Sequence, residues 1–170
     1  MTKKNMNWIF GDNINTDLIT PGRYNITTDP NEMSKIAFIE YRPEFAKQVK
    51  KEDLLIAGSN FGCGSSRETA AIALKYSGLK AIIAKSFARI FYRNCLNQGL
   101  LAVVADTDDI SENDSLVLDI NKKRLTNKTK KWTRVIDVPD FVVTLHEYGG
   151  IIPFLQKNGL NALSQLNNTK

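Results

Sequence analysis

The chain has few of the side chains that metal sites and disulfide frameworks require. Its 170 residues include two cysteines, Cys63 and Cys95, and one histidine, His146. Two distant cysteines are too few for a disulfide framework or a zinc site, and an iron–sulfur cluster needs about three or four thiolates. His146 falls in a predicted helix, where we expect a surface or packing residue. The sequence therefore predicts no cofactor and no metal on this chain.

Long apolar segments are also missing. No apolar run approaches the length of a membrane span, and Met1–Asn5 precedes no apolar core or cleavage-site pattern of the kind that signal peptides carry. With 42% hydrophobic and 24% charged residues, the composition is that of an ordinary soluble globular protein. We therefore expect a cytoplasmic protein that does not associate with membranes, with a length that suits one compact domain.

The formal net charge of +5 is modest, and basic residues gather at 122–124 and 128–131. Edge strands commonly carry lysines, so a solvated sheet edge is our first interpretation. A nucleic-acid patch is the alternative, but no interleaved aromatic platform supports it. Docking of a partner is a third possibility.

The first two thirds of the chain has an alternating pattern. Apolar runs at 8–10, 54–57, 81–84 and 100–105 predict strands, while 31–36, 66–76 and 88–98 predict helices, the last with Gly99 as its C-cap. Strands that alternate with helices indicate parallel crossovers. Short continuous apolar strands are typical of a sheet that is buried on both faces.

The last third changes character. Segments 115–120 and 132–137 look like antiparallel strands, with turns at 121–122 and 128–131. Helices are predicted at 140–148, ending at Gly149, and at 151–157. Residues 160–170 are polar, and we expect them to fray.

One stretch, Asn-Phe-Gly-Cys-Gly-Ser-Ser-Arg-Glu at 60–68, combines several features of an anion site. It lies between a predicted strand and a predicted helix, and Gly62 and Gly64 allow a sharp turn and close approach to a ligand. Ser65 and Glu68 have the spacing of a capping box with Ser65 at the N-cap, which would direct free N–H groups toward an anion. Arg67 adds a planar fork that fits a carboxylate or phosphate.

A simpler interpretation of the same stretch is a glycine turn and capping box that only start a helix. The spacing is neither that of a P-loop nor that of a dinucleotide fingerprint, so the residues do not identify the anion. The polar segment 11–17 suggests a calcium loop, but its glycine and glutamate spacing is wrong for one.

Four stretches together carry a more specific signal. Segments 11–17, 60–68, 84–94 and 149–150, in this order and spacing, resemble the small subunits of 3-isopropylmalate dehydratase, which form a swivelling domain of the aconitase superfamily. The resemblance spans most of the chain. It implies one α/β domain over residues 1–170 with a β/β/α architecture: a mainly parallel βαβαβ core, antiparallel strands and C-terminal helices.

The resemblance also implies a two-chain hydro-lyase. A large catalytic subunit would carry a four-iron–four-sulfur cluster, and the substrate would be a small hydroxy-dicarboxylate. The reaction would isomerise 2-isopropylmalate and 3-isopropylmalate by dehydration and rehydration in leucine biosynthesis. A related dehydratase acting on homoaconitate or another alkyl-malate stays open. So does a non-catalytic anion- or RNA-binding module, which the basic charge motivates.

Site residues follow from the resemblance only where this sequence matches its motifs. Ser65 would be the base that removes a proton from the carbon next to a carboxylate. Asp17 would act with Ser65 in catalysis, and the residues assigned to substrate binding are Ser66, Arg67, Thr16 and Ile26.

The chain departs from the family pattern in places that bear on the substrate. Thr69 stands where relatives usually have histidine, and Ala71 where they often have proline. Ile26 occupies the position at which relatives acting on homoaconitate tend to have arginine. Its apolar side chain suits a branched alkyl group, while its neighbour Asn25 is unusual.

Overall fold

A four-stranded parallel sheet forms the centre of the molecule in the computed structural model, which describes residues 5–166. The strands are β1 (Asn7–Ile9), β2 (Leu54–Ala57), β3 (Ala81–Ala84) and β4 (Ala102–Val104), in the order β1-β2-β3-β4. All residues of β2 and β3 are buried, as their continuous apolar sequence predicts. β2 and β3 have the predicted bounds, whereas β4 is shorter than the predicted 100–105.

The strand order explains the layers. Each crossover moves to the next strand in the same direction, and crossovers of this kind are right-handed, so the connecting helices all lie on one face. These helices are α1 (Thr16–Ile19), α2 (Pro30–Lys35), α3 (Glu44–Gln48), α4 (Thr69–Tyr76) and α5 (Arg89–Gln98), with a 3-10 turn, η1, at Gly22–Tyr24. On this face Leu55, Ala57 and Phe91 belong to one apolar cluster.

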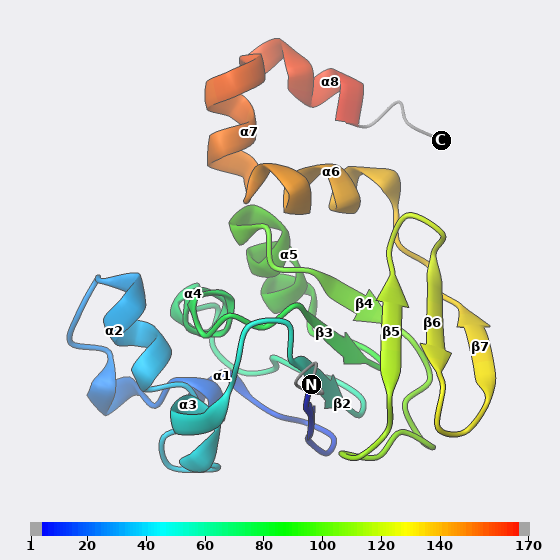
Figure 1. Cartoon of the computed structure of the whole chain (residues 1–170). Helices are drawn as coiled ribbons and strands as arrows, with labels where there is room; N and C mark the ends of the chain where they lie inside the picture. The colour runs from blue at the N-terminus through cyan, green and yellow to red at the C-terminus, as the bar shows by residue number, and fades with distance from the viewer. Residues whose placement is uncertain (1–4, 167–170) are drawn as a thin grey trace.

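A second, antiparallel sheet covers the opposite face. It contains β5 (Leu116–Asp119), β6 (Arg124–Asn127) and β7 (Trp132–Val135), in the order β5-β6-β7. Leu118 and Leu125 pack with Ile56 and Ile83 in a second apolar cluster. Figure 1 shows α2, α3 and α4 on one side of the parallel sheet and β5–β7 on the other. The three layers confirm the expected β/β/α architecture.

The prediction for this second sheet was incomplete. The strands expected at 115–120 and 132–137 do not pair with each other, because both pair with β6, which lies between them. The sequence of β6, Arg-Leu-Thr-Asn, contains a single apolar residue, Leu125, which is fully buried. A strand of four residues with one apolar side chain offers too little alternation to be recognised.

The C-terminal segment is helical almost to the end of the described residues. α6 (Asp140–Tyr148) has the predicted bounds and ends at the left-handed Gly149, and α7 (Ile151–Asn158) extends one residue beyond the prediction. A 3-10 turn, η2 (Leu160–Ala162), and α8 (Leu163–Leu166) follow. Residues 160–166 are therefore helical, while the expectation that 160–170 frays concerns motion and stays a prediction; residues 167–170 lie outside the described part.

A small apolar cluster packs this helical segment against α6 and α7. Ala162 packs with Leu145 and Phe154, and all three are buried. Figure 1 shows α7 and α8 extending away from the two sheets. Within residues 5–166, none of the helices has the length and apolar character needed to cross a membrane.

Candidate functional site

The loops that follow β1, β2 and β3 meet at the carboxyl edge of the parallel sheet. Beyond the ends of the strands, backbone hydrogen bonds also join these loops to one another. The N–H groups of Gly62, Thr16 and Phe61 donate to the carbonyls of Ile14, Cys63 and Ser86 over 2.7, 2.8 and 3.0 Å. This edge is where open α/β sheets usually bind ligands.

Two glycines shape the turn after β2, as the sequence predicts. Gly62 and Gly64 have φ angles of 80° and 98°, which side-chain-bearing residues rarely adopt. A Cβ on Gly62 would lie 2.1 Å from Cγ of Phe91, and one on Gly64 would lie 3.2 Å from Oγ1 of Thr16. The glycines therefore allow the turn to pack closely against α5 and α1.

The predicted capping box is not formed. Helix α4 begins at Thr69 rather than at Ser66, and its N-cap is Glu68, whose side chain makes no capping hydrogen bond. The Ser65 hydroxyl is occupied by other partners, and Glu68 accepts a hydrogen bond from Gln98 Nε2 at 2.9 Å. Ser65 therefore lies in the turn ahead of the helix rather than at its N-cap.

Ser65 instead belongs to a cluster of polar side chains from two elements. Its Oγ lies 3.1 Å from Oγ1 of Thr16 and accepts a hydrogen bond from Nε of Arg67 at 2.7 Å. The same guanidinium forms an ion pair with Asp17 through Nη2. The structure thus brings together four of the six predicted site residues: Thr16, Asp17, Ser65 and Arg67.

Burial differs across this cluster. Thr16 is 1% exposed, whereas the side chains of Arg67 and Asp17 are 36% and 61% exposed. Ser65 is exposed as well. The Thr16 hydroxyl is therefore a fixed group at the base of the cluster, while the serine hydroxyl and the guanidinium face solvent and remain accessible to a ligand.

Ser66 lies beside the cluster and is held by a residue that sequence reasoning did not assign to the site. Its carbonyl accepts a hydrogen bond from Nδ2 of Asn94 at 3.4 Å. Asn94 is 8% exposed and lies on the same helix as the buried Phe91 and Cys95. One signal in the sequence could have identified Asn94. It is a polar residue on the face of the helix where the helical spacing otherwise places apolar residues.

Ile26 is not part of the cluster. Its side chain is 90% exposed, and no described contact joins it to Ser65 or Arg67. The turn that precedes Ile26 lies close to the Arg67 guanidinium, since a Cβ on Gly22 would lie 2.9 Å from Nη1 of Arg67. The segment carrying Ile26 therefore starts beside the guanidinium and leaves the Ile26 side chain in solvent.

Thr69, the first residue of α4, has a local contact. Oγ1 of Thr69 lies 3.4 Å from Oγ1 of Thr20, which is buried. Thr69 therefore links the first residue of α4 to the end of α1.

The described residues do not fit a resident iron–sulfur cluster or other metal centre. Cys95 is fully buried, and burial raises the pKa of its thiol well above the ordinary value. Cys63 is half-buried in the turn after β2. Within residues 5–166, no three His, Cys, Asp or Glu side chains are grouped so that they could hold a metal ion.

Comparisons with known proteins identify the family of the chain. Residues 2–108 match the aconitase C-terminal domain family. The chain is 49% identical over 149 residues to 3-isopropylmalate dehydratase small subunit 1 of Archaeoglobus fulgidus, covering 86% of this chain and 92% of that one. It is 45% identical over 152 residues to the methanogen homoaconitase small subunit of Methanocaldococcus jannaschii, covering 89% of each.

A solved structure is similar over nearly the whole chain. The crystal structure of 3-isopropylmalate dehydratase from Methanocaldococcus jannaschii superimposes with a TM-score of 0.87 at 42% identity. The match covers 95% of this chain and 98% of the other. The overall fold is therefore shared along the length of both chains.

Proposed function

This chain belongs to the aconitase C-terminal domain family, and we propose that it is the small subunit of a 3-isopropylmalate dehydratase. That enzyme is a hydro-lyase that isomerises 2-isopropylmalate and 3-isopropylmalate by dehydration and rehydration in leucine biosynthesis. Relatives with this name are 45–49% identical and are covered nearly end to end. The proposal retains a single swivelling domain over residues 1–170 and the cytoplasmic location expected from the sequence.

The name of these relatives implies a large-subunit partner, and we propose that this partner carries the four-iron–four-sulfur cluster. The described residues of the present chain offer no ligand set for it. When bound, such a cluster supplies a Lewis acid for the leaving hydroxyl. The present chain contributes the groups at the carboxyl edge of its parallel sheet.

Ser65 is the proposed base. A serine hydroxyl is a poor base unless the alkoxide is stabilised, and a charge-assisted hydrogen bond is among the stronger ways to do so. Arg67 donates such a bond from Nε at 2.7 Å, and Thr16 places a buried hydroxyl at 3.1 Å. These two contacts to one oxygen are the observation that carries the proposal.

Arg67 and Asp17 have complementary proposed roles. Asp17 holds Nη2 of the guanidinium and so fixes its plane. The remaining N–H groups are free to bind a substrate carboxylate in the two-point geometry that arginine favours. The exposed hydroxyl of Ser66 is an added donor for the same carboxylate.

A homoaconitase small subunit is the second candidate, because one relative at 45% identity has that name. The residue type at position 26 argues against it. By the family resemblance this position bears on substrate choice, and Ile26 has no cation to pair with a further carboxylate. The branched alkyl group of isopropylmalate suits its apolar side chain.

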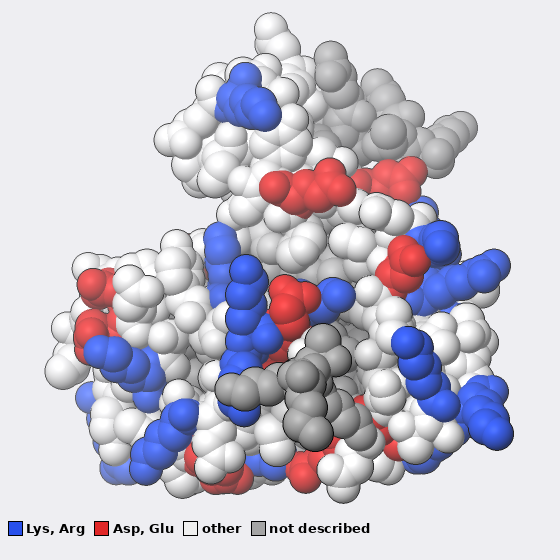
Figure 2. Space-filling view, in the orientation of Figure 1, with Lys and Arg blue, Asp and Glu red and all other residues white. Residues whose placement is uncertain are grey.

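A non-catalytic RNA-binding module has less support. Several cations around the antiparallel sheet are already paired with carboxylates of this chain: Lys122 with Asp119, Lys123 with Asp140, Lys130 with Asp114, and Arg134 with Asp106 and Asp109. Figure 2 shows Lys and Arg side chains gathered on the side of the molecule where β5–β7 lie, and nucleic acid that bound there would have to compete with these pairs.

The test is reconstitution with the cognate large subunit under anaerobic conditions. The assay measures turnover of 2-isopropylmalate, other alkyl-malates and homoaconitate by the pair and by each chain alone. We expect turnover only from the pair, with isopropylmalate preferred. Activity of the present chain alone, or an inactive but correctly assembled pair, would contradict the proposal.

A further inference from the structure

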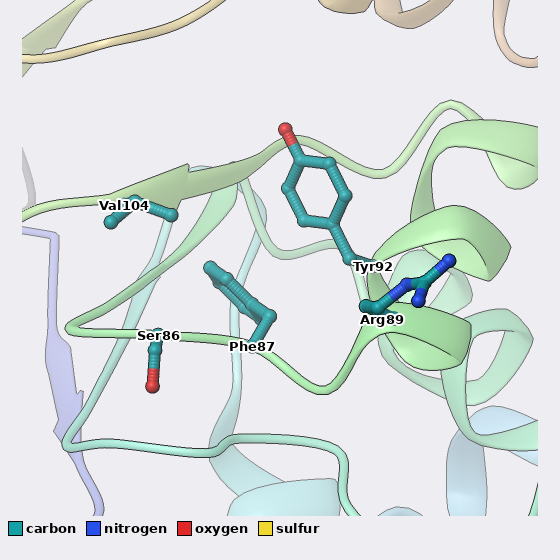
Figure 3. Close-up of a pocket in the computed structure, with 5 residues that line it drawn as sticks. All are labelled: Ser86, Phe87, Arg89, Tyr92 and Val104. Atoms are coloured by element: carbon teal, nitrogen blue, oxygen red, sulfur yellow. The ribbon is translucent and has the colours of Figure 1, made fainter.

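A hollow at the N-terminal end of α5 has no role in the site described above. It is a cavity of about 430 Å³ lined by Ser86, Phe87, Arg89, Tyr92 and Val104. Figure 3 shows the Phe87 and Tyr92 rings standing between Val104 of β4 and the first turns of α5, with Arg89 on the helix side. A second hollow, lined by Arg89, Ile90 and Arg93, adjoins it. We call these two hollows together the α5 patch.

The floor of the α5 patch is apolar. The rings of Phe87 and Tyr92 are 5.7 Å apart between centroids. Val104 and Ile90 are 45% and 46% exposed, although both belong to regular elements of the core domain. Exposed apolar residues that gather around a cavity are typical of a surface that binds another protein.

The helix side of the α5 patch is basic, while on the strand side the exposed Asp137 pairs with Val104 in an isolated antiparallel bridge. Arg89 and Arg93 are exposed, and neither forms an ion pair with any residue in the described range 5–166. By contrast, the nearby Lys85 pairs with Asp108, and Arg134 with Asp109. Two free guanidinium groups on adjacent turns would attract carboxylates from a binding partner.

The α5 patch is continuous with the catalytic turn. Residues four apart lie on the same face of a helix, and Gln98, Asn94 and Ile90 follow one another at this spacing. Gln98 contacts Glu68 and Asn94 contacts Ser66, so successive turns of α5 lie along the loop that carries Ser65. Ile90 lies one turn further on, and a partner that covers the exposed Ser65 would therefore extend over this patch.

We propose that the α5 patch docks an acidic segment of the large subunit, in which carboxylates flank one aromatic or branched aliphatic side chain. This inference rests on the proposed function as a small subunit. The carboxylates pair with Arg89 and Arg93, and the apolar side chain enters the hollow beside Val104. A second copy of this chain fits less well, because a two-fold contact through the patch would place arginines against arginines.

The test is a binding titration of this chain against the purified large subunit. Arg89→Glu/Arg93→Glu reverses the charge on the helix side of the patch, and Lys47→Glu/Lys128→Glu is the matched control, since it makes the same charge change at exposed lysines on other elements. We expect the dissociation constant to rise about tenfold or more for the arginine variant at low salt. The control should bind within about twofold of wild type.

Salt and turnover separate this role from others. The effect of the arginine variant should shrink at high salt, because screening weakens exposed ion pairs. Val104→Lys, which blocks the apolar hollow, should weaken binding at both salt concentrations. Saturating small subunit should restore near-normal turnover to the arginine variant, because neither arginine belongs to the catalytic cluster.

Three outcomes would overturn the inference. Equal affinity of the arginine variant and its control would refute docking at the α5 patch, while an active wild-type pair would leave the proposed function intact. Tight binding of short single-stranded poly(U) RNA that is lost in the arginine variant would assign the patch to nucleic acid. A wild-type chain that neither binds nor activates the large subunit would overturn both proposals.

Discussion

Replacement of Arg67 by lysine separates the charge of this residue from its geometry. The guanidinium contacts Ser65 through Nε at 2.7 Å and Asp17 through Nη2, two nitrogens of one rigid plane. A lysine ammonium is a single point on a flexible stem. Arg67→Lys keeps the positive charge. A single ammonium, however, cannot bond to the Ser65 oxygen, to Asp17 and to a substrate carboxylate at the same time.

The expected loss follows from the number of contacts. A hydrogen bond to a charged group contributes about 1.5–3 kcal/mol, and the lysine loses at least one of them in the transition state. This corresponds to a fall of about 10- to 150-fold in kcat/KM. The folded state should change little, because the Arg67 side chain is 36% exposed and its ion pair with Asp17 is near the surface.

The assay is steady-state kinetics of the reconstituted enzyme, with melting temperature and affinity for the large subunit measured in parallel. Arg23→Lys is the control, since Arg23 also pairs with a carboxylate, Glu40, but lies outside the cluster at 71% exposure. It should keep near-normal kinetics. If Arg67→Lys behaved like this control, Arg67 would lie outside the substrate site and the proposed two-point contact would be refuted.

Three further predictions address the base of the cluster, the substrate and the fold. Thr16→Val should lower kcat/KM about two- to tenfold, because it removes the hydroxyl that lies 3.1 Å from Oγ of Ser65, and Thr16→Ser should restore it. If kcat/KM and the pH–rate profile of Thr16→Val were unchanged, a role for this hydroxyl would be excluded. Ile26→Arg should raise the ratio of kcat/KM for homoaconitate to that for isopropylmalate by about tenfold or more, and an unchanged ratio would exclude Ile26 from the substrate pocket. Asp114→Ala should lower the free energy of unfolding by about 1–3 kcal/mol in urea titrations, because Nδ2 of the buried Asn127 donates a hydrogen bond to Asp114 at 2.7 Å. A smaller loss of unfolding free energy would show that solvent replaces this hydrogen bond in the variant.

The same aspartate predicts a pH dependence of stability. Burial acts to raise the Asp114 pKa, but hydrogen bonds from Ser111, Asn127 and Lys130 outweigh it and lower the pKa below 3.8. A carboxyl group whose pKa is lowered by folding stabilises the protein fully above its unfolded pKa and loses that contribution as the pH falls through the folded value. The stability difference between wild type and Asp114→Asn should therefore shrink below about pH 4. A difference that stays constant with pH would contradict this assignment.

The parallel core was predictable because its signal is local. β2 and β3 are continuous apolar runs, and Gly99 marks the end of α5 by its left-handed φ of 70°. The antiparallel sheet was harder, since β6 depends on one buried leucine and on the fully buried Asn127, which looks like a surface residue in the sequence. Helical structure at 160–166 depends on the packing of Ala162 against Phe154. Because this is a tertiary contact, it leaves no periodic pattern in the sequence.

At the site, residue identities were easier to predict than their local roles. The motif resemblance selected Thr16, Asp17, Ser65 and Arg67, and the structure places them together. The capping box is not formed because the Ser65 hydroxyl has other partners. It accepts a hydrogen bond from Arg67, two residues further along the same turn, and it lies beside Thr16, which only the joining of the loops after β1 and β2 brings close.

The role of Ser65 as the base is tested most directly by Ser65→Ala in the reconstituted enzyme. Because Ser65 does not cap α4, this change removes the proposed base without removing a helix cap. Ser66→Ala is the control, since the neighbouring hydroxyl is exposed and lies beside the cluster. We expect turnover to fall about 100- to 10,000-fold in Ser65→Ala, with melting temperature and affinity for the large subunit unchanged, and a much smaller loss in Ser66→Ala. A stable, assembled Ser65→Ala enzyme with near-normal turnover would contradict the assignment of Ser65 as the catalytic base.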